Sequence, residues 1–228
     1  MNIFRTIRQA DPGFEPGCIF DIGANVGQTH AQIRLAYPDT PVHCFEPVSA
    51  TFATLAAAVA ADPATTAHCL AFAARPGRAL MQARPGGVTN RIIADAPANK
   101  AIPTEEVEVV SGDMFCAAHG IARIGILKVD TEGHDLDVLV GFREMLAERR
   151  VAYVETECGI SPRNLMHVPF ARMADFMFAM GYGLFGLYPG GVHPKGYANL
   201  NTGKRERGIW YGNLVFVPEP WPEDAIPM

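Results

Sequence analysis

The chain has 228 residues, 49% of them hydrophobic, and a formal net charge of −5, which leaves enough apolar content for the core of a single α/β domain. The acidic balance gives no electrostatic reason to expect a nucleic-acid backbone or an anionic membrane surface as a partner. The first residues lack the apolar core of a signal peptide, and no run reaches the roughly 18 apolar residues of a membrane span.

Apolar runs alternate with segments of helical periodicity along the chain, the pattern of a parallel sheet covered by helices on both faces. In chain order, we expect strands over residues 18–21, 42–46, 67–73, 107–110, 124–129, 151–156, 182–187 and 209–217. Helices are expected over residues 28–37, 49–61, about 134–150 and 170–180. The sequence therefore predicts a doubly wound α/β fold as one domain over residues 1–228, with its core at about 18–217.

Two long segments rich in turn-forming residues interrupt this alternation, at 86–105 and 188–208. Loops of this length in a compact domain are usually functional or disordered. We expect them to supply the contacts to the molecule on which the protein acts. Their sequences do not identify that molecule, and they leave the oligomeric state open.

The five cysteines are odd in number and widely spaced, and they include no CxxC pair for zinc or redox chemistry. We interpret them as buried thiols in a reducing compartment, which favours a cytoplasmic location. The residues concerned are Cys18, Cys44, Cys69, Cys116 and Cys158.

The stretch CIFDIGANVGQTH, residues 18–30, places an acid and then a turn of small residues between a strand and a helix. It is not the GxGxxG of a dinucleotide-binding turn, because Asn25 replaces the middle glycine and the spacing differs. It is not a phosphate-binding loop either, because no Gly-Lys-Ser/Thr follows. S-adenosylmethionine suits it: its ammonium prefers a carboxylate such as Asp21, and glycine lets the backbone approach a ligand closely. A tight turn without a ligand is the alternative.

A second acid, Glu46, follows the next apolar run in VHCFEP. At the end of the second strand of a doubly wound sheet, an acid can accept hydrogen bonds from both hydroxyls of a ribose. A solvated surface glutamate is the alternative. The position directly after an apolar strand and before Pro47 favours the ribose contact.

With these motifs and LKVDTEGHDLDVLVGF further on, the chain resembles the FkbM-type family of class I S-adenosylmethionine-dependent methyltransferases. The matching segments cover nearly the whole chain, and DTEGHDLDVLVGF is the most distinctive. They lie at residues 21–27, 46–47, 130–141, 151–155 and 211–217. The resemblance implies a seven-stranded, mostly parallel sheet with an antiparallel last strand. It also implies methylation of an oxygen on a sugar or a natural-product intermediate.

Motif and resemblance together indicate which residues bind the cofactor. We expect contacts from Asp21, Gly23, Ala24, Asn25, Gly27, Thr29, Glu46, Pro47 and Asp130. Two other activities stay open. The acceptor could be a nitrogen or a macromolecule, or the protein could bind S-adenosylmethionine without transferring its methyl group.

Acids at the carboxyl ends of parallel strands should share one rim of the sheet. Such a cluster needs cations, and oxygen ligands suit Mg²⁺ or another divalent cation. We therefore expect a metal site at Asp130, Glu132 and Glu155. We expect only one of Glu155 and Glu157 to line the pocket, and the resemblance favours Glu155. Asp135 is interpreted as stabilising the following helix through its dipole.

Methyl transfer to a hydroxyl requires a group that removes the hydroxyl proton. The candidates for catalysis are Asp130, His134 and Glu155. His134 has an ordinary pKa near 6.5 and directly follows the acid cluster. An exposed or capping histidine at a helix start is the alternative for this residue.

Overall fold

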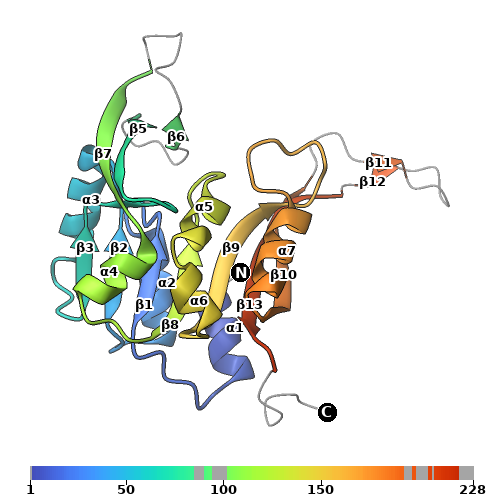
Figure 1. The fold of residues 1–228 in the computed structure, drawn as a ribbon, viewed down its shortest axis with the longest axis horizontal. Helices are drawn as coiled ribbons and strands as arrows, with labels where there is room; N and C mark the ends of the chain where they lie inside the picture. Colours follow the sequence, from blue (N-terminus) through green and yellow to red (C-terminus); the bar gives the residue numbers. More distant parts are fainter. Residues whose placement is uncertain are drawn as a thin grey trace.

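The computed structural model of the chain describes residues 2–84, 90–93, 102–192, 197–198, 205–206 and 208–220. Within them, a seven-stranded sheet runs through the middle of the molecule in the order β3-β2-β1-β8-β9-β13-β10 (Figure 1). Its strands are β1 (Ile19–Ile22), β2 (Val42–Phe45), β3 (Thr65–His68), β8 (Ile124–Val129), β9 (Val151–Gly159), β10 (Tyr182–Val192) and β13 (Ile209–Pro218).

The last strand of the sheet is reversed, as the resemblance implies. β13 lies between β9 and β10 and is antiparallel to both, whereas the pairs among β3, β2, β1, β8 and β9 are parallel. The predicted α/β fold with a doubly wound, mostly parallel sheet and an antiparallel last strand is confirmed.

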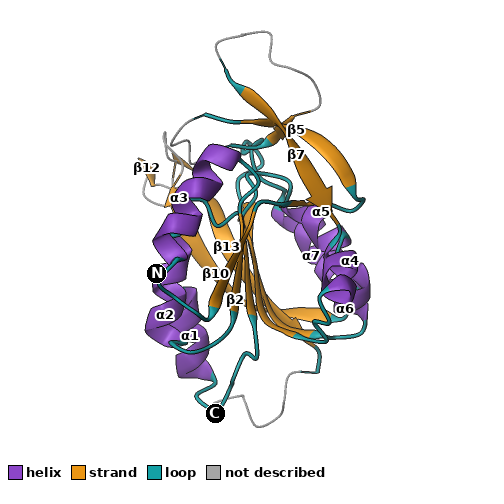
Figure 2. Cartoon of the chain, turned by 90° about the vertical axis from the view of Figure 1, so that its left-hand side faces the viewer, coloured by secondary structure: helices purple, strands orange, loops and turns teal. Residues whose placement is uncertain are grey.

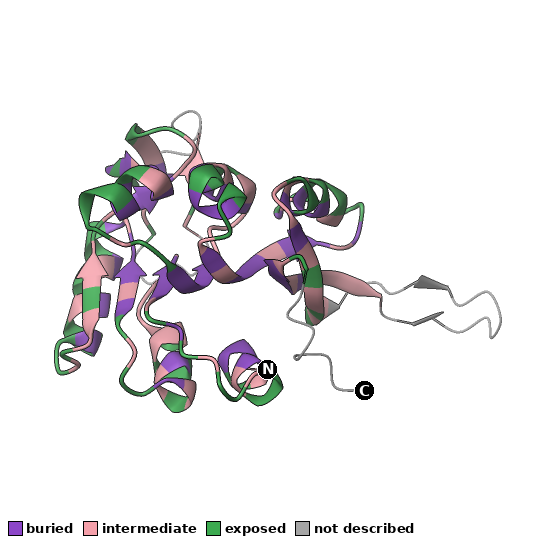
Figure 3. Cartoon of the chain, turned by 60° about the horizontal axis from the view of Figure 1, so that its bottom comes forward, coloured by how far each residue is buried: buried purple, intermediate pink, exposed green. Residues whose placement is uncertain are grey.

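Helices cover both faces of the sheet, in two layers that Figure 2 shows edge-on. One layer consists of α1 (Ile3–Ala10), α2 (Gln28–Ala36) and α3 (Ser49–Val59). The other consists of α4 (Gly112–Ala118), α5 (Asp135–Val140), α6 (Arg143–Ala147) and α7 (Phe170–Ala179). Because each face packs against a helical layer, buried residues concentrate on the sheet and on the inner sides of the helices (Figure 3).

The strand β1 shows how one segment serves two cores. Phe20 and Ile22 belong to the apolar cluster under α4–α7, whereas Ile19 belongs to the cluster under α1–α3. Asp21 alternates with Phe20, so its carboxylate lies on the α1–α3 face, where it is fully buried. A buried charge at this place requires a partner.

A second sheet stands over the carboxyl ends of the main sheet, at the top of Figures 1 and 2. It has the order β4-β7-β5-β6, with β4 (Ala71–Phe72), β5 (Gly77–Gln82), β6 (Ile92–Ile93) and β7 (Thr104–Val110). The strand expected over 107–110 therefore exists but lies outside the main sheet. The strand expected over 67–73 is wrong as a single unit: it divides between β3 and β4, because Ala71 and Phe72 pair with β7.

The helix expected over 134–150 is also divided, into α5 and α6. At the break, a Cβ on Gly141 would lie 2.4 Å from the backbone oxygen of Ala73, so the chain approaches the second sheet too closely for a side chain. The helices α1 and α4 and the strands β5 and β6 were not expected from the sequence, and β9 and β10 run further than expected. The remaining strands are β11 (Tyr197–Ala198) and β12 (Arg205–Glu206).

All five cysteines are free, and three of them are buried as expected. Cys18 is half-buried and Cys69 is exposed, which corrects the interpretation of all five as buried thiols. Among the described residues, no helix combines the length and the apolar character that a membrane crossing needs. Most of the two expected acceptor loops, at 86–105 and 188–208, lies outside the described residues.

Candidate functional site

A cavity of about 290 Å³ lies over the carboxyl ends of β1, β2 and β8, beneath the second sheet. One wall is the turn after β1, a second follows β2, and a third is the loop between β8 and α5. Met81 and Ile92 of the second sheet, with Asn90 just before β6, close it from above. Its lining also includes Ile22, Gly23, Ala24, Asn25, Gln28, Thr29, Glu46, Pro47, Leu70, Ala71, Phe72, Asp130, Thr131, Glu132 and His134.

The turn after β1 crosses the strand ends very closely. Gly23 has a φ of +80°, and a Cβ built on it would lie 1.9 Å from the backbone oxygen of Asp130. The N–H groups of Gly23 and Ala24 both donate to the oxygen of Phe45 at 3.0 Å. Asn25 and Gly27 also have positive φ values, of 49° and 95°. The small residues are therefore required by the backbone path, and that path exposes the main chain to the cavity.

Glu46 is 6% exposed and lines the cavity from the end of β2. Its Oε1 accepts a hydrogen bond of 3.0 Å from the N–H of Val48. Burial raises the pKa of Glu46, and the backbone N–H groups of Val48 and Asn25 oppose that shift. The carboxylate is thus fixed in direction, which suits it to accept hydrogen bonds from a bound polar ligand.

Asp21 lies just below the cavity and not in its lining. Its Oδ1 accepts a hydrogen bond of 3.0 Å from the ammonium of Lys128, whose Nζ also lies 3.5 Å from Oδ2 of Asp130. In the sheet register, Lys128 stands directly between Asp21 on β1 and Glu155 on β9. The buried ammonium of Lys128 therefore pairs with Asp21 and Asp130 and has Glu155 as its neighbour on the next strand.

Burial and neighbouring charges shift the pKa values of both Lys128 and Glu155. Burial alone would lower the pKa of Lys128, but the charges of Asp21, Asp130 and Glu155 raise it above its ordinary value. Glu155 is 6% exposed, and burial above all raises its pKa to about 7. One oxygen each of Asp21 and Glu155 is buried with no hydrogen-bond partner among the described residues.

The expected metal site at Asp130, Glu132 and Glu155 is not supported. Among the described residues, no group of three or more histidine, cysteine, aspartate or glutamate side chains is arranged to hold a metal ion. Glu155 lies too deep, beside Lys128, whereas Asp130 and Glu132 line the cavity. The cation that the acid cluster requires is the ammonium of Lys128.

The loop from Asp130 to His134 is held by Asp135. Its two carboxylate oxygens accept hydrogen bonds from the N–H groups of Thr131 and Gly133, at 3.4 and 3.1 Å. Asp135 is fully buried, and burial raises its pKa to about 7. Asp135 is therefore structural, as expected, although it acts on the loop before α5.

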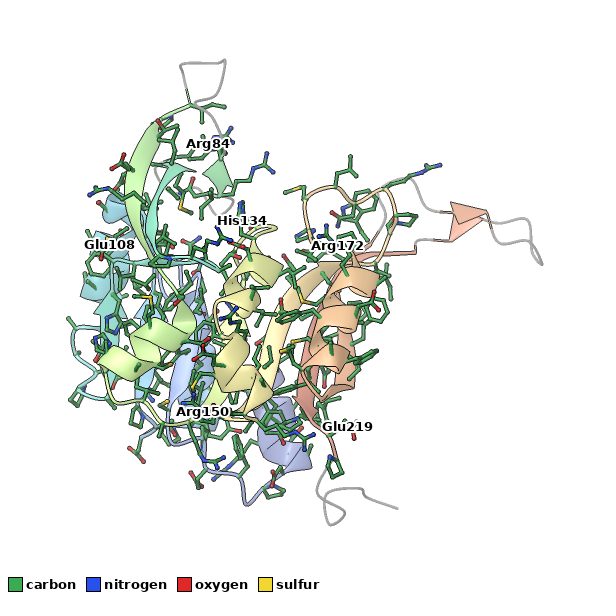
Figure 4. All side chains as sticks on the ribbon, viewed as in Figure 1. Arg84, Glu108, His134, Arg150, Arg172 and Glu219 are labelled. Atoms are coloured by element: carbon green, nitrogen blue, oxygen red, sulfur yellow. The ribbon has the colours of Figure 1, made fainter. Side chains whose placement is uncertain are left out.

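His134 projects from the start of α5 toward the space under the second sheet (Figure 4) and lines the cavity. Its Nδ1 is buried without a hydrogen-bond partner among the described residues, and burial lowers its pKa. The ring is therefore neutral near pH 7.

The cavity brings together most of the expected site residues. Of the expected cofactor contacts, Gly23, Ala24, Asn25, Thr29, Glu46, Pro47 and Asp130 line it, whereas Asp21 and Gly27 lie behind it. Of the expected catalytic residues, Asp130 and His134 line it and Glu155 does not. Sequence reasoning missed Lys128, whose only signal is that it is the single charged residue in the apolar run IGILKV.

Comparisons with known proteins agree with this arrangement. The family described as "Methyltransferase FkbM domain" matches residues 21–184. The chain is 27% identical over 157 residues to "Hexuronic acid methyltransferase AglP" of Haloferax volcanii, covering 66% of this chain and 60% of that protein's length. The crystal structure of "Methyltransferase FkbM" from Methylobacillus flagellatus KT superimposes with a TM-score of 0.56 at 15% identity, covering 93% of this chain and 47% of that one.

A seven-stranded sheet with one reversed strand and a cavity over its carboxyl ends is the architecture of the class I methyltransferases. Since the family match covers most of its length, the chain belongs to the FkbM methyltransferase family. It spans about 60% of the curated relative and about half of the solved one.

Replacing Lys128 with methionine leaves the acids around it uncompensated in the interior. We expect Lys128→Met to lower the free energy of unfolding by about 3–5 kcal/mol, the usual cost of removing one partner of a buried ion pair. Urea denaturation at pH 7.5 measures this free energy of unfolding. The control is Arg143→Ala, because the Arg143–Glu144 pair is 3.8 Å long with side chains 69% and 62% exposed and should contribute little. Equal stability of the two variants would contradict the structural role of Lys128.

Adding one methyl group at Gly23 should disrupt the turn after β1. The positive φ alone costs a side chain about 1–2 kcal/mol, and the collision with Asp130 adds to that cost. We expect Gly23→Ala to unfold at clearly lower denaturant than the wild type. Gly13→Ala is the matched control, since no atom lies within 4 Å of its added Cβ. If both variants unfold like the wild type, the close crossing of the turn over Asp130 is wrong.

Proposed function

We propose that this chain transfers the methyl group of S-adenosylmethionine to a hydroxyl oxygen of a sugar. The observation that carries the proposal is the cavity in which the glycine turn and Glu46 face Asp130 and His134. The sugar is supported by the relative whose name states a hexuronic acid methyltransferase.

The residues of the cavity fit the cofactor. The buried carboxylate of Glu46 suits the ribose hydroxyls, and Asp130 suits a positively charged group. Leu70, Phe72 and Met81 provide apolar surface for a flat ring. When bound, S-adenosylmethionine supplies a methyl carbon activated by a positive sulfur.

The protein's own tasks are positioning and removal of the acceptor proton. We assign the second task to His134, because it lines the cavity and burial keeps its imidazole neutral. Asp130 is the alternative base, since it lines the same cavity. We assign Glu155 a positioning role through Lys128, because it stands beside that ammonium and outside the cavity lining.

Both sheets line this one cavity, so we further propose that residues 1–228 act as a single domain. Met81 and Ile92 come from the second sheet, whereas Ile22 comes from the main sheet. The shape of the cavity then depends on how the second sheet packs against the main sheet.

The ribose assignment predicts that Glu46→Gln weakens binding of the demethylated product, S-adenosylhomocysteine, about 10- to 100-fold. Hydrogen bonds to a charged group contribute about 1.5–3 kcal/mol, and glutamine removes the charge while keeping the shape. Isothermal titration calorimetry measures the dissociation constant. Glu108→Gln is the control, because Glu108 is exposed on β7 and outside the cavity lining (Figure 4). Unchanged affinity in Glu46→Gln refutes the ribose contact.

The base assignment predicts that His134→Gln lowers kcat about 10²- to 10³-fold, the range of general-base contributions, with little effect on cofactor affinity. Because only the neutral imidazole accepts a proton, wild-type activity should fall as the pH drops through the His134 pKa, which lies below the ordinary 6.5. The measurement is S-adenosylhomocysteine release with a panel of glycosides between pH 4.5 and 8. If the activity of His134→Gln still falls at low pH as the wild-type activity does, the general base is Asp130 and not His134.

A further inference from the structure

A group of side chains on the β9 side of the cavity takes no part in the functions described so far. Glu157 comes from β9, Tyr211 from β13, and His167 from the loop between β9 and α7. In Figure 1 that loop lies beside the one that leads into α5. The two loops touch: a Cβ on Gly133 would lie 2.1 Å from the backbone oxygen of Met166. The group therefore borders the cavity wall formed by Asp130–His134.

The ring of His167 is fixed on two sides. Its Nε2 lies 2.7 Å from Oε2 of Glu157, and these side chains are only 7% and 14% exposed. Asn164, itself 4% exposed, accepts a hydrogen bond of 3.2 Å from the N–H of His167 and lies 3.1 Å from its Nδ1. The hydrogen bond that His167 donates to Glu157 raises the pKa of His167, which favours the charged pair.

Tyr211 is held between this histidine and strand β10. Its ring stacks on His167 with centroids 5.0 Å apart and an interplanar angle of 19°. A Cβ on Gly190 or Gly191 would lie 2.3 or 2.4 Å from the Tyr211 ring, so only glycine lets the ring lie across that strand. The ring is therefore confined between His167 and β10.

In the sheet register, Lys128 and Glu155 are paired neighbours, so Asp130 and Glu157, each two residues further on, lie side by side, and Tyr211 pairs with Gly159 two residues beyond Glu157. Tyr211 therefore stands on the same rim of the sheet as Asp130. Burial raises the pKa of Tyr211, and the charges of Glu157, Asp130 and Glu132 raise it further. The phenol therefore keeps its proton and acts as a hydrogen-bond donor beside carboxylates that accept. Asp130 and Glu132 both line the cavity, and Glu132 adopts a φ of +55° that is rare for a residue with a side chain.

We propose that the region between Asp130, Glu132 and Tyr211 is the acceptor subsite and that it binds two neighbouring hydroxyls of a sugar ring. The two carboxylates accept hydrogen bonds from the hydroxyls, and Tyr211 donates one to a ring or hydroxyl oxygen. The excess of carboxylates repels an anionic group at this point, so any carboxylate of the sugar faces away from it. This subsite rests on the proposed sugar O-methylation.

The test uses Tyr211→Phe, which keeps the stacked ring and removes only the hydroxyl. The probes are methyl β-D-glucopyranoside and its uronic acid counterpart. Sugar binding is measured by saturation-transfer NMR on enzyme saturated with S-adenosylhomocysteine. Turnover is measured on enzyme saturated with S-adenosylmethionine. We expect Tyr211→Phe to raise the dissociation constant or KM for the accepted sugar about 10-fold and to leave the S-adenosylhomocysteine dissociation constant unchanged. A loss of one neutral hydrogen bond of this kind has about that size.

Two further variants separate the site from fold stability. Tyr182 lies at the other end of β10, and its hydroxyl donates to the oxygen of Val151 at 2.7 Å. Tyr182→Phe should therefore lower the melting temperature without changing the KM for the sugar. Gly191→Ala displaces the Tyr211 ring and should weaken sugar binding as Tyr211→Phe does. The double variant should bind the sugar no more weakly than either single variant, because both changes remove the same contact.

Several outcomes would overturn the subsite. A wild-type KM for the sugar in Tyr211→Phe would do so, as would a wild-type protein that binds S-adenosylhomocysteine but neither sugar. In both cases the cofactor assignment stands. Failure of the wild type to bind S-adenosylhomocysteine contradicts the proposed function itself and is measured separately.

Discussion

The ion pair between Lys128 and Asp21 is the interaction on which the architecture of the site depends. It joins the adjacent parallel strands β1 and β8 one residue before their ends, where both side chains are buried and water does not compensate charge. Without the ammonium, Asp21 and Glu155 would bring carboxylates together in an apolar interior. In the register of the sheet, β1 and β8 end at the same level, at Ile22 and Val129. The glycine turn can then cross directly over Asp130, which places the main chain against the cavity.

Most of the local features could be predicted from the sequence, because they depend on neighbouring residues. The turn at Gly23 and Asn25 follows from small residues after an apolar strand, and Glu46 follows from an acid at the end of the next one. The role of Lys128 depends on the register of three strands, and its partner Asp21 lies 107 positions away in the chain. No spacing in the chain reports that register.

The wrong prediction of a single 67–73 strand and the wrong prediction of a metal site have related causes. The alternation in TEEVEVV correctly indicates a strand, but pairing with Ala71 and Phe72 is a long-range choice, and it divides the expected 67–73 strand. The expected metal followed from counting acids at strand ends without their depth. Glu155 precedes the end of β9 by several residues, so it meets an ammonium inside the sheet and not a ligand at the rim.

The cavity and the proposed acceptor subsite beside it are held in different ways. On the β1 and β2 side, positive φ values and a backbone contact leave no room for a side chain, so the geometry is set by the main chain. On the β9 and β13 side, an ion pair and a stacked ring hold Tyr211, so the geometry is set by side chains. Backbone-defined sites change little among proteins that share a ligand, whereas side-chain-defined ones can be altered by single substitutions. The proposed division therefore places the constant cofactor on the first side and the variable acceptor on the second.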